Sequence, residues 1–111
     1  MKKTQLGEFE EIVLLTIAVL NNNAYGVSIK NEMEDRLGRS VSIGALQTAL
    51  KRLEDKGFLK SHLGEPSQKR GGKRKRFYHI SAVGLDALDE IRDIRTQLWS
   101  SIPQVVLNTR K

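Results

Sequence analysis

The sequence predicts one mainly helical domain with a small β-hairpin, extended by a C-terminal helix, and three observations indicate this fold class. In four segments apolar residues recur every three or four positions, which is the spacing of one helix face. Between the third and fourth of these segments, two short strand-like runs flank a polar loop that contains Gly71 and Gly72. No strand–helix–strand alternation occurs, which excludes the parallel-sheet folds of dinucleotide- and flavin-binding enzymes in a chain of 111 residues.

The first helix is predicted over about residues 4–20. Its apolar residues stand three or four positions apart: Leu6, Phe9, Val13, Ile17 and Leu20. From Ile12 onward the segment is apolar on nearly every side, so the helix should be buried on every side. A partner subunit could cover it, or it could lie at the centre of its own domain. The pattern alone leaves both interpretations open.

The second and third helices are predicted from their apolar spacing and their end signals. A polar turn over residues 21–23 precedes a helix over about 25–37, and Gly38 suits the left-handed position just past its end. Ser40 or Ser42 can cap the third helix. Its expected inner stripe is Ile43, Leu46, Leu50 and Leu53, and Gly57 with Phe58 should end it.

A hairpin and a last helix complete the predicted domain. Strands are expected over residues 58–63 and 73–80, on either side of the polar loop 64–72. Ser81 can cap the last helix, and Pro103 should end it. The apolar side of this helix is expected to hold Leu85, Leu88, Ile91, Ile94 and Leu98. No structure is predicted for the tail over residues 104–111.

Positive charge is concentrated in one part of the chain. The net charge of the whole chain is +6, but residues 41–80 alone hold ten basic and three acidic residues and so carry +7. Six of these cations lie within the eight residues 69–76. Such a stretch is typical of a surface that binds a polyanion, most commonly nucleic acid, although a purely solubilising face is the alternative.

Three helices followed by a basic hairpin are the parts of a winged helix-turn-helix, in which the third helix enters the DNA major groove. The outward side of that helix should include Gln47, whose amide can pair with adenine, and Lys51, whose cation can contact guanine or phosphate. The candidate DNA-binding residues are Ser42, Gly44, Gln47, Thr48, Lys51, Lys69, Arg70, Lys73, Arg74, Lys75 and Arg76. Residues 1–80 would form this DNA-binding domain, and residues 81–111 a dimerisation helix with a short tail.

Several stretches, in this order, resemble the PadR-type transcriptional regulators over about residues 9–98. They are Tyr25-Gly26 with Ile29, Gly44-Ala45-Leu46, the run 49–54, Gly57-Phe58-Leu59, the Gly71-Gly72 wing and the run 77–81 with Gly84. The family usually has Tyr followed by Pro where this chain has Gln47 and Thr48, and it often has an aromatic residue at the position of Leu63. The family's base-contacting tyrosine is therefore not carried over, and Gln47 is chosen for its own chemistry.

The resemblance implies a dimeric repressor in which the first helix packs against the partner's C-terminal helix. The expected interface residues are Phe9, Val13, Ile17, Leu20, Leu88, Ile91, Ile94 and Leu98. Some members of the family bind flat aromatic compounds at this interface, so Trp99, the only tryptophan, could line a pocket for a small aromatic effector. Packing within the dimer interface is the alternative role for Trp99.

The remaining function classes find little support in the sequence. The chain has no cysteine, which excludes a Cys-based zinc finger and a thiol nucleophile. Its only histidines, His62 and His79, fall on the predicted strands, which argues against a catalytic histidine, and no cofactor is expected. The apolar run from Ile12 to Leu20 has nine residues, too few to span a bilayer, and no cleavage signal follows it. A cytoplasmic protein is therefore expected. The main rival to a DNA-binding regulator is a winged-helix module that binds protein or structured RNA.

Overall fold

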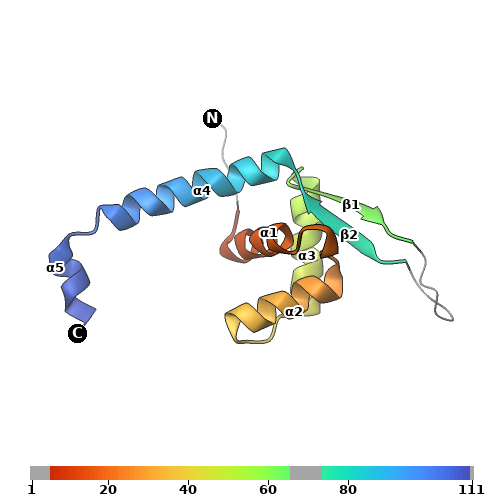
Figure 1. Ribbon diagram of the computed structural model, residues 1–111, viewed down its shortest axis with the longest axis horizontal. Coiled ribbons are helices and arrows are strands. Elements are labelled where there is room, and N and C mark those ends of the chain that lie inside the picture. Colours follow the sequence, from red (N-terminus) through yellow and green to blue (C-terminus); the bar gives the residue numbers. More distant parts are fainter. Residues whose placement is uncertain (1–5, 66–73, 111) are drawn as a thin grey trace.

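The computed structural model of the protein describes residues 6–65 and 74–110. Its elements are α1 (Glu8–Leu20), a 3₁₀ turn η1 (Asn21–Asn23), α2 (Gly26–Leu37), α3 (Ile43–Asp55), β1 (Leu59–Leu63), β2 (Arg76–Ile80), α4 (Ala82–Ser100), α5 (Gln104–Leu107) and a 3₁₀ turn η2 (Asn108–Arg110). The three helices and the hairpin form the predicted winged helix-turn-helix, and α4 extends away from it (Figure 1).

The molecule is elongated because α4 and α5 project from the rest of the fold. It measures 62 × 37 × 22 Å, and its radius of gyration is 17.0 Å. A compact chain of this length would have a radius of gyration of about 13 Å. The far half of α4 therefore lies outside the protomer's own core.

The helix α1 begins at Glu8, later than the sequence predicted. Gly7 is the N-terminal cap, and its amide N–H donates to the carboxylate of Glu10 at 3.3 Å. Leu6 precedes the helix, and the predicted first residues at positions 4 and 5 lie outside the described part of the chain. The free first-turn amides favour the three glutamates that follow the cap.

The turn between α2 and α3 is built by local signals that the sequence predicted. Gly38 has φ 69° and ends α2 in the left-handed conformation, which glycine adopts without steric cost. Ser42, rather than Ser40, caps α3 and accepts a hydrogen bond from the Ala45 amide at 3.1 Å. At the other end of α3, the Phe58 amide donates to the Leu53 carbonyl at 2.9 Å, the bond expected when Gly57 ends the helix.

One core joins α1, α2, α3 and the hairpin. Its fully buried side chains include Leu14 from α1, Met33 from α2 and Leu50 from α3. The assignment of Ile43 to the inner stripe of α3 is wrong, because its side chain is 50% exposed while Leu46, Leu50 and Leu53 are buried. Ile43 is the first residue of the helix, where the other helices no longer cover that side.

The two sides of α1 differ, so the expectation of burial on every side is only half met within one protomer. Val13 and Ile17 are buried in the protomer's own core. On the other side, Leu15, Ala18 and Val19 are exposed. The helix is therefore both a core helix and the carrier of an uncovered apolar strip.

The wing is an antiparallel hairpin with Leu59 opposite Ile80 and Leu63 opposite Arg76. Both strands are shorter than predicted: the first begins one residue later, at Leu59, and the second begins at Arg76. The Tyr78 amide donates to the Ala24 carbonyl at 2.8 Å, which attaches β2 to the start of α2. Tyr78 itself is buried in the core.

The last long helix, α4, is capped by Ser81, which accepts from the Gly84 amide at 3.0 Å, and it ends at Ser100 before Pro103. Gly84 allows the start of α4 to approach the turn between α3 and β1, because a Cβ there would lie 2.3 Å from the Phe58 carbonyl oxygen. The tail forms the short helix α5 and the turn η2. Within the described ranges, no helix is long and apolar enough to cross a membrane.

Candidate nucleic-acid interface

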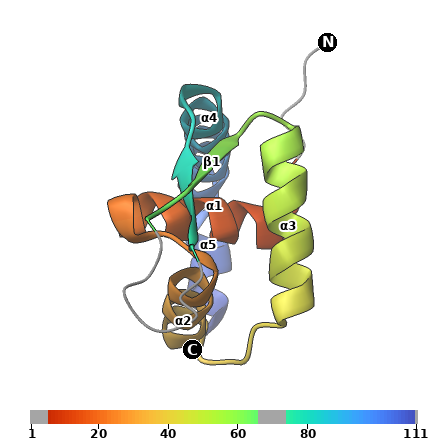
Figure 2. The ribbon, with the colours of Figure 1, turned by 90° about the vertical axis from the view of Figure 1, so that its right-hand side faces the viewer.

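The helix α3 stands at the edge of the molecule, and Figure 2 shows no other element on its outer side. Its inner side is held by Leu46, Leu50 and Leu53 in the core. The predicted DNA-binding residues of this helix and its cap are all exposed: Ser42, Gly44, Gln47, Thr48 and Lys51. The helix therefore presents one continuous face, long enough to enter a DNA groove, as the sequence indicated.

The polar side chains of this face are only weakly engaged within the protein. Lys51 forms an ion pair with Asp55 at 3.4 Å, and both side chains are mostly exposed. Such a pair between neighbouring turns contributes about 0.3–0.5 kcal/mol, so Lys51 can exchange Asp55 for a phosphate at little cost. Gln47 lies beside the start of α2: a Cβ atom added at Gly26 would be 3.8 Å from the Gln47 Nε2 atom.

A charged side chain holds the turn that sets the angle between α2 and α3. The Glu34 carboxylate accepts a hydrogen bond from the Val41 amide at 2.8 Å and one from the Lys30 ammonium at 2.9 Å. These two bonds, the Val41 bond first, lower the pKa of Glu34 below its ordinary value. The carboxylate therefore stays ionised at neutral pH and keeps Val41, just before the cap of α3, in place.

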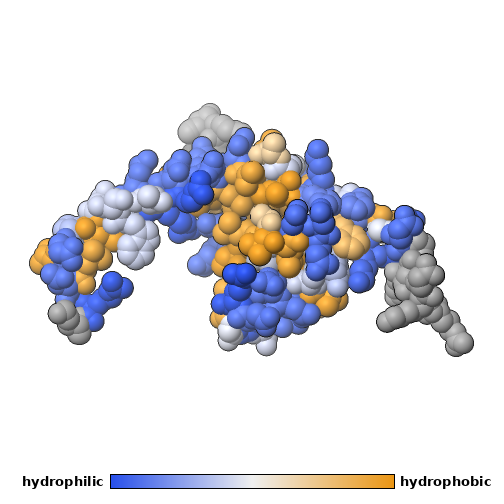
Figure 3. Space-filling model, viewed as in Figure 1, coloured by the Kyte–Doolittle hydropathy of each residue, from blue (hydrophilic) through white to orange (hydrophobic). Residues whose placement is uncertain are grey.

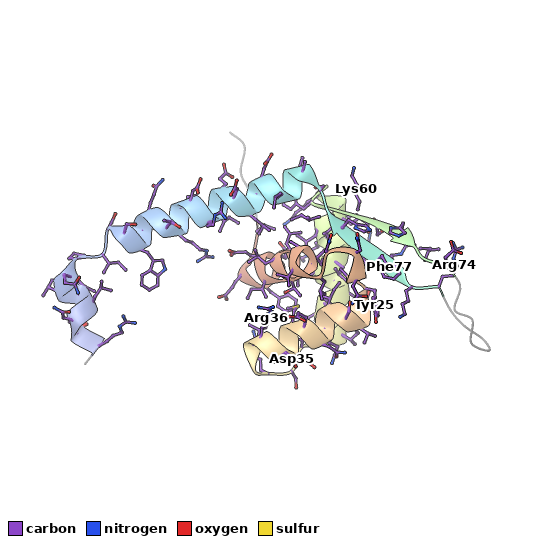
Figure 4. All side chains as sticks on the ribbon, in the orientation of Figure 1. Tyr25, Asp35, Arg36, Lys60, Arg74 and Phe77 are labelled. Atoms are coloured by element: carbon purple, nitrogen blue, oxygen red, sulfur yellow. The ribbon has the colours of Figure 1, made fainter. Side chains whose placement is uncertain are left out.

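Of the six predicted wing cations, Arg74, Lys75 and Arg76 lie within the residues that the structure describes. Lys69, Arg70 and Lys73 lie outside the described residues. Arg74 and Lys75 are exposed just before β2, and Figure 4 shows Arg74 at the far end of the hairpin. The Arg74 Nε donates to the Gly64 carbonyl at 2.8 Å, which leaves its other guanidinium nitrogens available for an anion.

The sequence did not predict two contacts that orient the wing. The Lys75 ammonium lies 4.1 Å from the centre of the Tyr25 ring, and that ring meets Phe77 edge-on at 5.5 Å. Tyr25 and Phe77 face one another in Figure 4, where α2 meets the hairpin. Alternation along an extended chain from Lys75 into β2 places Lys75 and Phe77 on the same side, but only the folded structure brings Tyr25 to that side.

The opposite side of the hairpin is tied to α3. Arg76 donates to the Ser61 hydroxyl at 2.9 Å, and that hydroxyl donates to the Glu54 carboxylate at 2.7 Å. Burial first, and then the negative charge of Glu54, raise the pKa of Tyr78 above its ordinary value, so its hydroxyl stays protonated. The predicted phosphate contact Arg76 is thus partly used inside the protein, where it fixes the wing relative to α3.

The two histidines of the chain lie together on the hairpin. His62 and His79 stack with ring centres 5.0 Å apart, on the side of the hairpin that also carries Phe77. Residues 6–65 and 74–110 contain no group of three or more His, Cys, Asp or Glu side chains placed to hold a metal ion.

The predicted interface residues fall into buried and exposed groups. Val13, Ile17 and Leu88 are buried within the protomer, while Phe9, Leu20 and Ile91 are half-buried. Ile94 and Leu98 are exposed on α4, Leu98 by 66%. The sequence prediction omitted Leu15 and Val19 because nearly every residue from Ile12 to Leu20 is apolar, so the spacing did not say which side faces outward.

A groove of about 320 Å³ runs between α1 and α4. Its apolar wall includes Leu15, Ala18, Leu85 and Trp99. Apolar residues gather over this region, below α4, in the surface view of Figure 3. Trp99 is 64% exposed, and Arg95 crosses the groove to the Glu11 carboxylate at 2.8 Å.

Comparison with known proteins identifies relatives of this fold. The sequence model of the transcriptional regulator PadR-like family matches residues 14–90. A PadR-like transcriptional regulator from Bacillus cereus is 20% identical, with 88% of this chain and 90% of that chain covered and a TM-score of 0.69. A PadR-like transcription factor from Bacteroides fragilis is also 20% identical, with 87% and 88% covered and a TM-score of 0.73.

A third solved structure, a PadR family transcriptional regulator from Eggerthella lenta, is 24% identical, with 89% of this chain and 86% of that chain covered and a TM-score of 0.66. At such identities the three structures establish the fold alone. No curated protein sequence matches the chain significantly.

Proposed function

The chain belongs to the PadR-like family of transcriptional regulators, and we propose that it acts as a homodimeric repressor on an inverted-repeat DNA operator. Residues 1–80 form the DNA-binding domain in this proposal, and residues 81–111 form the dimerisation helix with its tail. The observation that carries the proposal is the outward face of α3 combined with the basic wing that Glu54, Ser61 and Arg76 fix beside it.

The two parts would make different contributions to binding. The wing cations would contact phosphates, which gives affinity without sequence preference and makes binding depend on salt. The face of α3 would contact base edges, which gives sequence preference. A bound dimer would then block transcription by occupying the operator.

The projecting helix supports the dimer. Ile94 and Leu98 are exposed on α4, and Leu15 and Val19 are exposed on α1. In the family arrangement, the first helix packs against the partner's C-terminal helix, which would cover both strips at once. A two-fold dimer would present two α3 helices to half-sites about one helical turn, roughly 34–36 Å, apart.

The replacement Gln47→Ala tests whether this face reads bases. If Gln47 pairs with adenine, its loss should cost about 1–3 kcal/mol at the preferred sequence and almost nothing on random DNA. Fluorescence anisotropy with both DNAs measures the difference. The control is Gln97→Ala, which removes an exposed glutamine from α4. Equal weakening on specific and random DNA would remove base reading from Gln47.

The groove beside Trp99 supports a further part of the proposal, that a small aromatic effector regulates the dimer. An apolar wall with a few charged groups suits a flat compound of modest size, held between the two subunits beside Trp99. A ligand that favours one spacing of the two α3 helices would change DNA affinity by its differential affinity for the two states.

A titration with planar aromatic compounds tests the effector role of Trp99. A compound that stacks on Trp99 should quench its fluorescence and, at the same concentrations, weaken DNA binding. Since Trp99 is the only tryptophan, the signal has one source. Unchanged fluorescence and unchanged DNA binding across the compounds would leave Trp99 with a packing role alone.

The rival function, a module that binds protein or structured RNA, makes a different use of the same surfaces. Sequence-specific RNA binding generally uses exposed aromatic rings on which bases stack. In the described wing, Tyr78 is buried and Phe77 is half-buried against Tyr25. The arrangement therefore favours double-stranded DNA over RNA.

A further inference from the structure

The first residue of α3 is a large apolar side chain that the protein covers only in part. Ile43 is 50% exposed, although Leu46 and Leu50, which lie one and two turns further along the same helix, are buried. Single exposed apolar residues are common on protein surfaces, so exposure alone decides nothing. Ile43, however, is the first residue of the helix that is proposed to enter the DNA major groove.

The N-terminal residues of the helix that enters the major groove are the ones that contact base edges. In α3 these residues are Ile43, Gly44 and Ala45, and all three are exposed. None of them carries a polar side chain. The Ser42 hydroxyl just before them already accepts a hydrogen bond from the Ala45 amide at 3.1 Å. The first turn of α3 can therefore recognise a base mainly through apolar contact.

Thymine is the base that offers an apolar group in the major groove, its C5-methyl. We infer that Ile43 contacts the methyl group of a thymine in each half-site and makes the protein prefer thymine there. The inference rests on the proposed DNA-binding function and adds a second specificity-determining residue to it.

The position of that thymine follows from helix geometry. Ile43 and Gln47 are four residues apart, so they are neighbours on one side of α3, with Cβ atoms about 5–6 Å apart. Successive base pairs are about 3.4 Å apart along DNA. The thymine that Ile43 contacts therefore lies within about two base pairs of the base that Gln47 contacts.

The test replaces single thymines by deoxyuridine, which removes only the methyl group. The preferred sequence is first selected from a random DNA library with the wild-type protein. Each thymine in one half-site is then replaced in turn, and the dissociation constant is measured for the wild type and for Ile43→Ala. The matched control is Val83→Ala, which trims an exposed β-branched residue near the start of α4, at the opposite end of α3 from Ile43.

Among these single replacements, one should weaken wild-type binding about fourfold, because it removes the methyl group that Ile43 buries. The same replacement should leave the affinity of Ile43→Ala unchanged, because the contact is already gone. Val83→Ala should respond to deoxyuridine as the wild type does.

Two outcomes overturn the inference while the DNA-binding function stands. In one, no deoxyuridine replacement distinguishes Ile43→Ala from the wild type. In the other, the selected half-site has no thymine within two base pairs of the position that responds to Gln47→Ala. A wild type that responds to no deoxyuridine replacement already meets the first outcome, whether or not Ile43→Ala folds. If the wild type selects no DNA sequence at all, the proposed function fails instead, and the two failures remain distinct.

Discussion

Replacing Ile94 and Leu98 together by glutamate should separate the protein into folded monomers. Both side chains are exposed in the protomer, so the replacements leave its core intact. In the proposed dimer the same residues are covered by the partner, and two buried, unpaired carboxylates would strongly oppose assembly. Sedimentation velocity should show the wild type as a dimer at micromolar concentration and the variant as a monomer, with the helical circular dichroism signal of each retained.

The loss of the dimer should weaken operator binding by roughly a hundredfold to ten-thousandfold, because each monomer would bind a single half-site without the partner's effective concentration. A matched control places two glutamates on another side of α4, with Gln97→Glu and Ser100→Glu, both at exposed positions. This control should remain a dimer. A wild type that sediments as a monomer, or a variant that still dimerises, would contradict the proposed interface.

Removing two wing cations, with Lys73→Ala and Arg74→Ala, should weaken binding to every DNA sequence by about the same factor. If each side chain holds one phosphate, the slope of log K against log salt should flatten by about two units. At low salt the affinity should fall roughly tenfold to a hundredfold, and the difference should shrink as salt rises. Anisotropy titrations on specific and random DNA at several salt concentrations measure both quantities.

The control for net charge removes two cations from the other end of the molecule, with Arg92→Ala and Arg110→Ala. Both residues are exposed, on α4 and η2. This variant has the same net charge as the wing variant, so it should show how much of the effect is long-range attraction. A salt slope that changes equally in the two variants would argue against phosphate contacts by the wing.

Features that depend on neighbours in the sequence were predictable. The caps Ser42 and Ser81 and the turn glycines Gly38 and Gly57 act through their own backbone or through bonds to residues three or four positions away. Apolar spacing likewise identified Leu46, Leu50 and Leu53 as the buried side of α3. These signals were sufficient for the fold class and for the outward face that carries Gln47 and Lys51.

Features that depend on how distant elements meet were not predictable. Helical spacing placed Ile43 on the buried side of α3, but burial of a first-turn residue requires another element to reach that end. The chain from Arg76 through Ser61 to Glu54 depends on the register of the hairpin and its distance from α3. The uniform apolar run in α1 gave no sign that Leu15 and Val19 face outward.

The most direct test of the central claim is selection of genomic DNA fragments by the purified protein, followed by sequencing. The proposed function predicts a short inverted-repeat consensus whose half-site centres lie about one helical turn apart, roughly 34–36 Å. The dimer variant Ile94→Glu with Leu98→Glu should lose this enrichment. If the wild-type protein enriches no sequence above background, the protein is not a sequence-specific DNA-binding regulator, and the protein- or RNA-binding module becomes the better account.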